Sequence, residues 1–134
     1  MTSAMRRIAG YAALFDIPDA ANDTIRRGAF NRTLAERSQP LPLLWQHRAE
    51  QRIGTVEFAQ EDARGLRVIA RIDASASRAA AELDAGAVSG LSFGYRARAF
   101  RRGEGGRVLE EIELLEVSLV THPLQHHARV HLVR

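Results

Sequence analysis

Two long stretches of the chain alternate between apolar and polar residues, and this alternation constrains the fold more than any other feature of the sequence. One stretch runs from Ile53 to Ile72 around the turn sequence EDARG, and the other runs from Gly90 to Val120 around RGEGG. Alternate residues of a β-strand point to opposite faces of a sheet. Each stretch therefore predicts a β-hairpin with one buried face and one solvated face.

Shorter segments predict further strands. The small and apolar residues from Arg7 to Phe15 predict a first strand, and the apolar run Leu43–Trp45 predicts another. The two prolines just before Leu43–Trp45 keep that part of the chain extended. A closing strand is expected at Val130 and the residues after it, whereas the turn-forming residues 16–23 predict a loop.

Two segments have the composition of short helices. One lies within residues 26–37, and the other lies within residues 75–86, where Ser75 or Ser77 is a candidate cap and Gly86 a stop. The sequence thus predicts about six or seven strands and two short helices in a single domain over residues 1–134. We expect an α+β fold whose main body is an antiparallel β-barrel, closed or nearly closed.

The composition restricts the class of protein. Of 134 residues, 46% are hydrophobic and 26% are charged, which is typical of a globular domain. No apolar run approaches the ~20 residues of a membrane span, and the N-terminal residues lack a signal-peptide pattern, so the cytoplasm is the expected location. The chain has no cysteine, which excludes disulfides, thiolate catalysis and cysteine-based zinc sites. The net charge of +3 is spread along the chain and predicts no specific nucleic-acid partner.

Three side chains on or beside predicted strands could carry chemistry. His47 ends the stretch LLWQH, Ser92 lies in GLSFGY, and Glu116 lies in LLEVSLV. A serine hydroxyl needs an adjacent base before it can attack, an imidazole is suited to that task, and a carboxylate behind the imidazole fixes its tautomer. Spacing alone also fits a plain strand serine, a solvated histidine and a surface carboxylate. The glycines beside the serine, Gly90 and Gly94, are expected to let a substrate backbone approach it.

The sequence offers two other sites, and both are less favoured. Histidines in the segment HPLQHHARVH could share a metal if the segment were helical, but its proline and alternation favour extended chain, where residues four apart are separated by roughly 13 Å. The arginine-rich stretch RARAFRRGEGGR could bind phosphate, but it surrounds a hairpin turn and lacks the helix that follows a phosphate loop. We therefore expect no metal and no cofactor.

Several blocks, in order, resemble the prohead (capsid maturation) proteases of tailed phages of the HK97 type. They are IAGYAALFD, IRRGAFNRTL, LPLLWQHRAEQRIGTV, GLRVIARI, GAVSGLSFGY and LLEVSLVTHP, and together they extend from about Ile8 to Val130. The resemblance implies a fold like that of the herpesvirus assembly proteases, a β-barrel flanked by helices. It also implies a serine endopeptidase that cleaves the scaffolding segment of the major capsid protein inside the immature shell in the bacterial host, often with self-cleavage.

Carried over by position, the resemblance makes Ser92 the nucleophile and His47 the base, with no cofactor. Glu116 matches the acidic residue of the last block and would orient the histidine, with Glu113 or His122 as alternatives. The oxyanion donors are expected among backbone N–H groups near Gly94. Arg96 or Arg98 is a less favoured alternative. The expected partner is the capsid protein, and no membrane partner is expected. The chain could also form a homo-oligomer. The rival reading is a catalytically inactive capsid-assembly or scaffold-binding barrel of the same fold.

Overall fold

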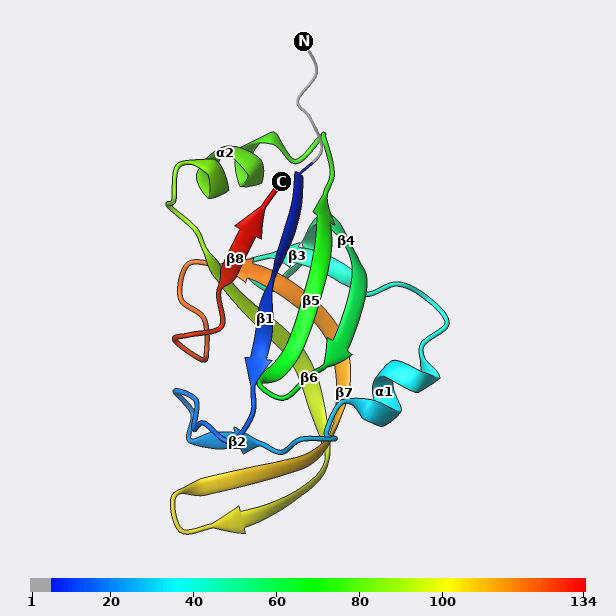
Figure 1. Ribbon diagram of the computed structural model, residues 1–134, viewed down its shortest axis with the longest axis vertical. Coiled ribbons are helices and arrows are strands. Elements are labelled where there is room, and N and C mark those ends of the chain that lie inside the picture. Colours follow the sequence, from blue (N-terminus) through cyan, green and yellow to red (C-terminus); the bar gives the residue numbers. More distant parts are fainter. Residues whose placement is uncertain (1–5) are drawn as a thin grey trace.

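The computed structural model describes residues 6–134, which form eight strands and two short helices (Figure 1). The strands are β1 (Arg6–Leu14), β2 (Asp23–Ile25), β3 (Pro42–Trp45), β4 (Arg48–Glu61), β5 (Gly65–Ile72), β6 (Gly90–Gly103), β7 (Gly106–Val120) and β8 (Val130–Val133). The helices are α1 (Asn31–Glu36) and α2 (Ser77–Asp84), and neither is long and apolar enough to cross a membrane.

All eight strands belong to one sheet, in which β7 has neighbours on both edges. β6 pairs with one edge of β7, and from the other edge the order runs β7-β3-β4-β5-β1-β8, with β2 beside the far end of β7. β2 and β3 both run parallel to β7, so the expectation of a mainly antiparallel barrel is only partly right, and the sheet is mixed. These parallel pairs join segments that are distant in the sequence, and local alternation carries no signal for them.

The sheet curls until its two ends meet (Figure 1). The backbone N–H of Leu91 donates to Ala128 O at 2.8 Å, and that of Val130 donates to Ser89 O at 2.8 Å. These bonds flank an isolated bridge between Gly90 and Arg129, which links the start of β6 to the residue just before β8. The nearly closed barrel of the sequence prediction thus corresponds to a curled sheet whose ends touch at this point.

The two predicted hairpins are confirmed as β4–β5 and β6–β7, and the first strand and both helices lie where they were expected. Two details differ. β2 begins at Asp23, the last residue of the predicted loop, and its three residues are too few for alternation to be detected. Neither Ser75 nor Ser77 caps α2, because Ala76 occupies the N-cap position, whereas Gly86 follows the helix end with a φ of +75° as expected of a helix stop.

The core fills the inside of the curled sheet. The inward-facing residues of β6 and β7 include Leu91, Phe93, Val117 and Leu119, all 4% exposed or less. Because side chains alternate along a strand, the residues between them face outward, and Ser92 and Ser118 are among these. The outer surface of the β6–β7 pair therefore carries the serine that the sequence singled out.

Candidate active site

His47 lies in a two-residue turn rather than at a strand end. β3 ends at Trp45 and β4 begins at Arg48, and these two residues are paired across the turn. Gln46 and His47 have φ values of +52° and +61°, the left-handed pairing of a type I′ hairpin turn. Such turns favour asparagine and glycine, and a residue other than glycine in this region costs about 1–3 kcal/mol. The candidate base thus lies within a strained turn.

Hydrogen bonds to the end of β7 hold this turn. The Gln46 N–H donates to Leu119 O at 3.0 Å. The Gln46 side chain donates to Thr121 Oγ1 at 2.7 Å and accepts from the Thr121 N–H at 3.1 Å. The His47 N–H donates to Ser118 Oγ at 3.1 Å. Because each bond ends on or beside β7, the turn is fixed to the strand that also carries Glu116.

The carboxylate of Glu116 joins the imidazole of His47. His47 Nδ1 lies 2.6 Å from Glu116 Oε1, and the Ser118 hydroxyl donates to Glu116 Oε2 at 2.5 Å. An ionised carboxylate can only accept, so the imidazole proton lies on Nδ1. Nε2 is then left as the acceptor. The Glu116 side chain is 12% exposed and that of His47 is 43% exposed, so the imidazole reaches solvent while its support is mostly covered.

Gly94 provides the space that the Glu116 carboxylate occupies. The two residues are directly opposite in the β6–β7 register. A Cβ built at Gly94 would lie 2.4 Å from Glu116 Oε1, which is far inside a normal contact. Gly90 has its own neighbours, since a Cβ there would lie 2.7 Å from both Val120 O and a Pro123 side-chain atom. The expectation that these glycines leave room for a substrate backbone is therefore wrong: protein atoms already fill both places.

Ser92 lies across from Ser118 in the same register, on the same outward face. Directly opposite residues of an antiparallel pair have Cβ atoms about 4.5–5.5 Å apart. Ser92 is 3% exposed. Within residues 6–134 its hydroxyl has no hydrogen-bond partner, and the hydroxyl oxygen retains some contact with solvent. The structure thus brings a free hydroxyl, a hydroxyl that contacts both His47 and Glu116, and the imidazole to one part of the β6–β7 face.

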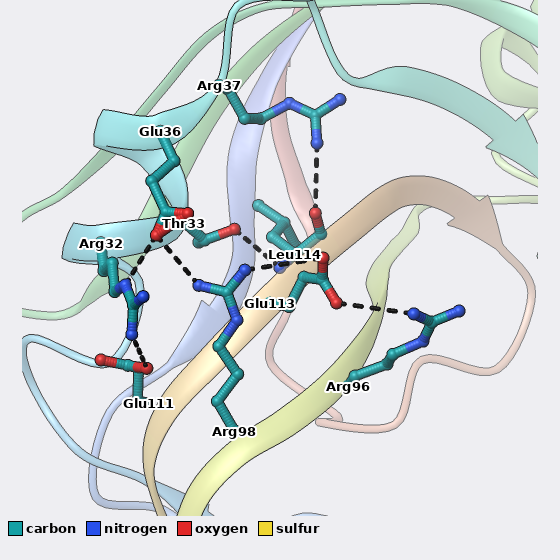
Figure 2. A network of polar contacts seen from close by, with 9 residues as sticks. All are labelled: Arg32, Thr33, Glu36, Arg37, Arg96, Arg98, Glu111, Glu113 and Leu114. Atoms are coloured by element: carbon teal, nitrogen blue, oxygen red, sulfur yellow. Dashed lines mark hydrogen bonds and ion pairs between the residues drawn. The ribbon is translucent and has the colours of Figure 1, made fainter.

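Glu113 is engaged elsewhere. Figure 2 shows its carboxylate between two arginines of β6, with Arg96 Nη1 at 3.7 Å and Arg98 Nη2 at 3.5 Å. Arg98 also pairs with Glu36 of α1 at 3.2 Å. Neither arginine is directed to Ser92: Arg96 is four residues further along β6, or roughly 13 Å at strand spacing. The network in Figure 2 ties α1 to the outer face of the sheet.

Within residues 6–134, none of the remaining histidines forms a hydrogen bond, ion pair or ring contact with His47 or Glu116. His122 is exposed, with no hydrogen bond or ion pair to the described part of the chain. The rings of His126 and His127 contact each other at a centroid distance of 5.0 Å, and His131 lies beside Tyr11 at 6.2 Å. Residues 6–134 contain no group of three acidic, histidine or cysteine side chains arranged to hold a metal ion. Of the alternatives for the third role, Glu116 alone contacts His47 in this part of the chain.

Sequence reasoning missed Ser118, Gln46 and Thr121, whose hydrogen bonds hold the His47 turn and the Glu116 carboxylate. A signal for Ser118 was present, since it lies two residues after Glu116 on a strand and so shares its face. Gln46 and Thr121 gave none, because their mutual contact depends on β3 pairing in parallel with β7.

Solved structures with a similar fold include proteases of a bacteriophage and of herpesviruses. Bacteriophage T4 capsid assembly protease superposes with a TM-score of 0.68 at 16% identity, covering 85% of this chain and 80% of that chain. The protease of Kaposi's sarcoma herpesvirus, solved with a hexapeptide phosphonate inhibitor, gives 0.64 at 12% identity, with coverages of 98% and 65%. Varicella-zoster virus protease gives 0.60 at 14% identity, with coverages of 95% and 63%. At these identities the likeness concerns the fold, which agrees with the herpesvirus-type architecture that the resemblance implied.

Sequence comparison is more specific. The prohead protease of Enterobacteria phage HK97 is 30% identical over 128 residues, which cover 90% of this chain. The chain spans 57% of the length of that relative. The family model described as caudovirus prohead serine protease matches residues 1–134. The chain therefore belongs to the caudovirus prohead serine protease family.

Proposed function

We propose that the chain is a serine endopeptidase in which Ser92 is the nucleophile, His47 the general base and Glu116 the group that orients the base. The observation that carries the proposal is the 2.6 Å contact between His47 Nδ1 and Glu116 Oε1, anchored through Ser118 to the strand position opposite Ser92. A left-handed turn without glycine, held by several hydrogen bonds, also fits a catalytic position, since such strain gathers at functional sites.

The first step would be acylation. His47 Nε2 takes the proton of the Ser92 hydroxyl as Oγ forms a bond to the scissile carbonyl carbon, and the carbonyl π electrons move to its oxygen. The positive imidazolium is stabilised by the Glu116 carboxylate at Nδ1. When the oxyanion re-forms the carbonyl, the C–N bond breaks, and the leaving nitrogen takes the proton from Nε2. The products are the released amine and an ester at Ser92.

The second step would be deacylation by the same groups. His47 Nε2 takes a proton from water as the water oxygen attacks the ester carbonyl. Collapse of the second tetrahedral intermediate breaks the bond to Ser92 Oγ, which regains its proton from Nε2. The carboxylic acid product then leaves, and the imidazole returns to the neutral form with its proton on Nδ1.

The open edge of β6 is the proposed place for the substrate backbone. Beyond Leu91, β6 pairs only with β7 within residues 6–134, so its other edge has unpaired N–H and C=O groups. An extended peptide could add to this edge as a further strand. Unpaired N–H groups near Ser92 are then the candidate oxyanion donors, in preference to Arg96 and Arg98, which face carboxylates.

Family membership and the names of the relatives, prohead protease and capsid assembly protease, support a role in head maturation. The proposed substrate is the scaffolding segment of a major capsid protein, cut inside the immature shell within the bacterial host. The chain itself is a second candidate substrate.

The test is co-expression of the chain with the capsid protein that accompanies it, with cleavage followed by gel electrophoresis and mass spectrometry. We expect cleavage by the wild type and none by Ser92→Ala or His47→Ala, because a nucleophile and its base act as a unit. Cleavage at the wild-type rate by Ser92→Ala would overturn the serine mechanism. Absence of cleavage in the wild type, with a folded chain that still binds the capsid protein, would favour the inactive barrel.

A further inference from the structure

Strands β5, β1 and β8 are neighbours in the sheet (Figure 1). Side chains on and beside these strands line a cationic groove. It is an open hollow with a volume of about 370 Å³, lined by Tyr11, Arg64, Arg67, His127, Arg129 and His131. We call it the arginine groove. Arg129 is bridged to Gly90, two residues before Ser92 on β6. The groove thus begins near the strand that carries the proposed nucleophile without sharing a side chain with it.

The arginines of the groove lack ionic partners. Within residues 6–134, Arg64 and Arg67 form no ion pair with any carboxylate, and neither does Arg129, whose guanidinium donates to His126 O at 2.7 Å and Ser89 Oγ at 3.1 Å. Several exposed arginines elsewhere on the sheet do have such partners, as Arg7 has in Glu57 at 2.8 Å. Three guanidiniums and a single bordering carboxylate give the groove a net positive charge, which attracts an anionic ligand.

One carboxylate borders the groove, and it already accepts three hydrogen bonds. Asp62 Oδ2 accepts from the Tyr11 hydroxyl at 2.5 Å, and Oδ1 accepts from the backbone N–H groups of Arg64 and Gly65 at 2.8 and 3.2 Å. Asp62 therefore organises the turn and the tyrosine. It interacts electrostatically with Arg64 but forms no ion pair with a guanidinium within residues 6–134. With three arginines and one carboxylate, the positive charge of the groove remains in excess.

The groove also has apolar surface, which selects among anions. The Tyr11 ring lies beneath the Arg64 guanidinium carbon at 5.0 Å and beside the His131 ring. A second hollow shares Arg67 and continues over Ala9 and Ile69. Ile69 is paired with Phe58 of β4, a large apolar residue that is 39% exposed. Carboxylates interspersed with apolar side chains suit this surface better than a phosphate backbone does.

We infer that the arginine groove binds an acidic segment of a polypeptide. Its position beside the start of β6 makes the substrate polypeptide the partner, a step that rests on the proposed function. Arg64, Arg67 and Arg129 meet the carboxylates, and Tyr11 with Ile69 meets apolar side chains between them. The groove thereby holds a region of the substrate away from the bond that is cut, and it contributes affinity and selectivity without touching the reacting atoms.

Binding is tested first without catalysis, in a Ser92→Ala background. The probe is a fluorescein-labelled peptide of alternating Glu and Leu, compared by anisotropy at about 0.1 M salt with the same peptide carrying Gln for Glu. We expect Arg64→Gln and Arg67→Gln each to weaken binding of the Glu peptide about fivefold or more, which corresponds to roughly 1 kcal/mol at an accessible charge pair. Both side chains lack hydrogen bonds within residues 6–134, so folding is expected to be unaffected.

The matched control is Arg102→Gln, because Arg102 also lacks a carboxylate partner within residues 6–134 but lies on the β6–β7 hairpin. It should leave binding unchanged. Equal losses for Arg102→Gln would show diffuse charge attraction, and equal binding of the Gln peptide would show that the carboxylates are not recognised. Either result would overturn the inference. Displacement of the peptide by a single-stranded oligonucleotide at lower concentration than by unlabelled peptide would assign the groove to nucleic acid instead.

A second arm separates this inference from the proposed function. In the active chain, the double variant Arg64→Gln/Arg67→Gln should raise KM for the acidic substrate about tenfold or more and leave kcat within about twofold. An unchanged KM would show that the substrate does not bind in the groove. If Ser92→Ala were to cleave normally, the serine mechanism would fail while the binding result remained valid, because the first arm requires no catalysis.

Discussion

His47 Nδ1 and Glu116 Oε1 lie 2.6 Å apart although 69 positions separate the two residues in the chain. The second oxygen of the same carboxylate accepts the Ser118 hydroxyl at 2.5 Å, and Ser118 in turn accepts the His47 backbone N–H. One oxygen of Glu116 thus holds the His47 ring, and the other is linked through the Ser118 hydroxyl to the His47 backbone. Such an arrangement holds a single tautomer, which is the condition for Nε2 to accept a proton.

Glu116→Gln should remove most of the activity and leave the fold intact. The amide keeps the shape of the side chain but can donate to Nδ1, which would move the ring proton to Nε2 and block proton transfer from Ser92. We expect kcat to fall by up to about 10⁴-fold, the loss seen when the orienting carboxylate of a triad becomes an amide. Cleavage rates at saturating substrate, together with a thermal melt, measure the two effects separately.

Glu113→Gln is the control for that variant, because it makes the same change three positions earlier on β7. Glu113 faces Arg96 and Arg98 (Figure 2), so kcat should remain within about threefold of the wild type. His122→Ala should be equally mild. If either change reduced kcat as much as Glu116→Gln, the orienting role would move to that residue.

Gly94→Ala should reduce kcat with little effect on KM. The new Cβ would lie 2.4 Å from Glu116 Oε1, so the carboxylate must move away from His47. A glycine that served the substrate backbone would instead affect KM, and the split between the two constants distinguishes these roles. We expect kcat to fall about tenfold or more, as misplacement of an orienting group does.

Gly105→Ala is the matched control for Gly94→Ala, since a Cβ at Gly105 would meet no atom within 4 Å. Its kinetic constants and melting temperature should match those of the wild type. Nitrogen-15 NMR of the His47 ring gives a direct readout: Gly94→Ala should shift the ring nitrogens from the Nδ1-protonated pattern, and Gly105→Ala should not. A normal ring spectrum in Gly94→Ala with a raised KM would contradict the prediction.

Ser118→Ala tests the positioning role of a residue that does not touch the substrate in the proposed mechanism. The change leaves Glu116 Oε2 and the His47 N–H without their partner, and an unmade bond of this kind costs about 1–3 kcal/mol. We expect kcat to fall about tenfold and the His47 ring spectrum to lose its single tautomer. Ser38→Ala, at an exposed position, should change neither quantity. A full-rate Ser118→Ala variant with an unchanged spectrum would exclude the role.

The sequence predicted the elements whose signal is local. Alternation located the β4–β5 and β6–β7 hairpins, because each joins neighbouring segments through a short turn. The parallel pairing of β3 with β7 was not predictable in this way, since Leu43 and Val117 meet across most of the chain. No periodic pattern identifies which distant strand a short apolar run will join.

The same limit applied to the site. Ser92, His47 and Glu116 were singled out by residue type and by the ordered blocks of the family, whereas their spacing alone also fitted unrelated surface residues. Their relative placement depends on the register that sets Leu44 beside Ser118, which carries the turn to β7. The left-handed turn itself was hidden, because neither Gln46 nor His47 belongs to the residue types that favour it.

Asp23 should make the stability of the protein depend on acid pH. Its side chain is 6% exposed and accepts two bonds from the Arg107 guanidinium, at 3.0 and 2.8 Å, and one from the Tyr95 hydroxyl at 3.2 Å. The hydrogen bond from Arg107 holds the pKa of Asp23 below its ordinary value of 3.8, although burial opposes this. A pKa that is lower in the folded state contributes stability above the unfolded pKa, and that stability is lost as the pH falls through the folded pKa.

The measurement is urea unfolding followed by the fluorescence of the buried Trp45, at a series of pH values for wild type and Asp23→Asn. At neutral pH the variant should be about 1–3 kcal/mol less stable, because Arg107 and Tyr95 lose a charged acceptor. This difference should stay constant down to about pH 5 and shrink below about pH 4, as the wild-type carboxyl becomes protonated. Asp84→Asn, at an exposed ion pair with Arg6, should have a much smaller effect. A wild-type-to-variant difference that persists unchanged at pH 3 would show that the charge of Asp23 does not stabilise the fold.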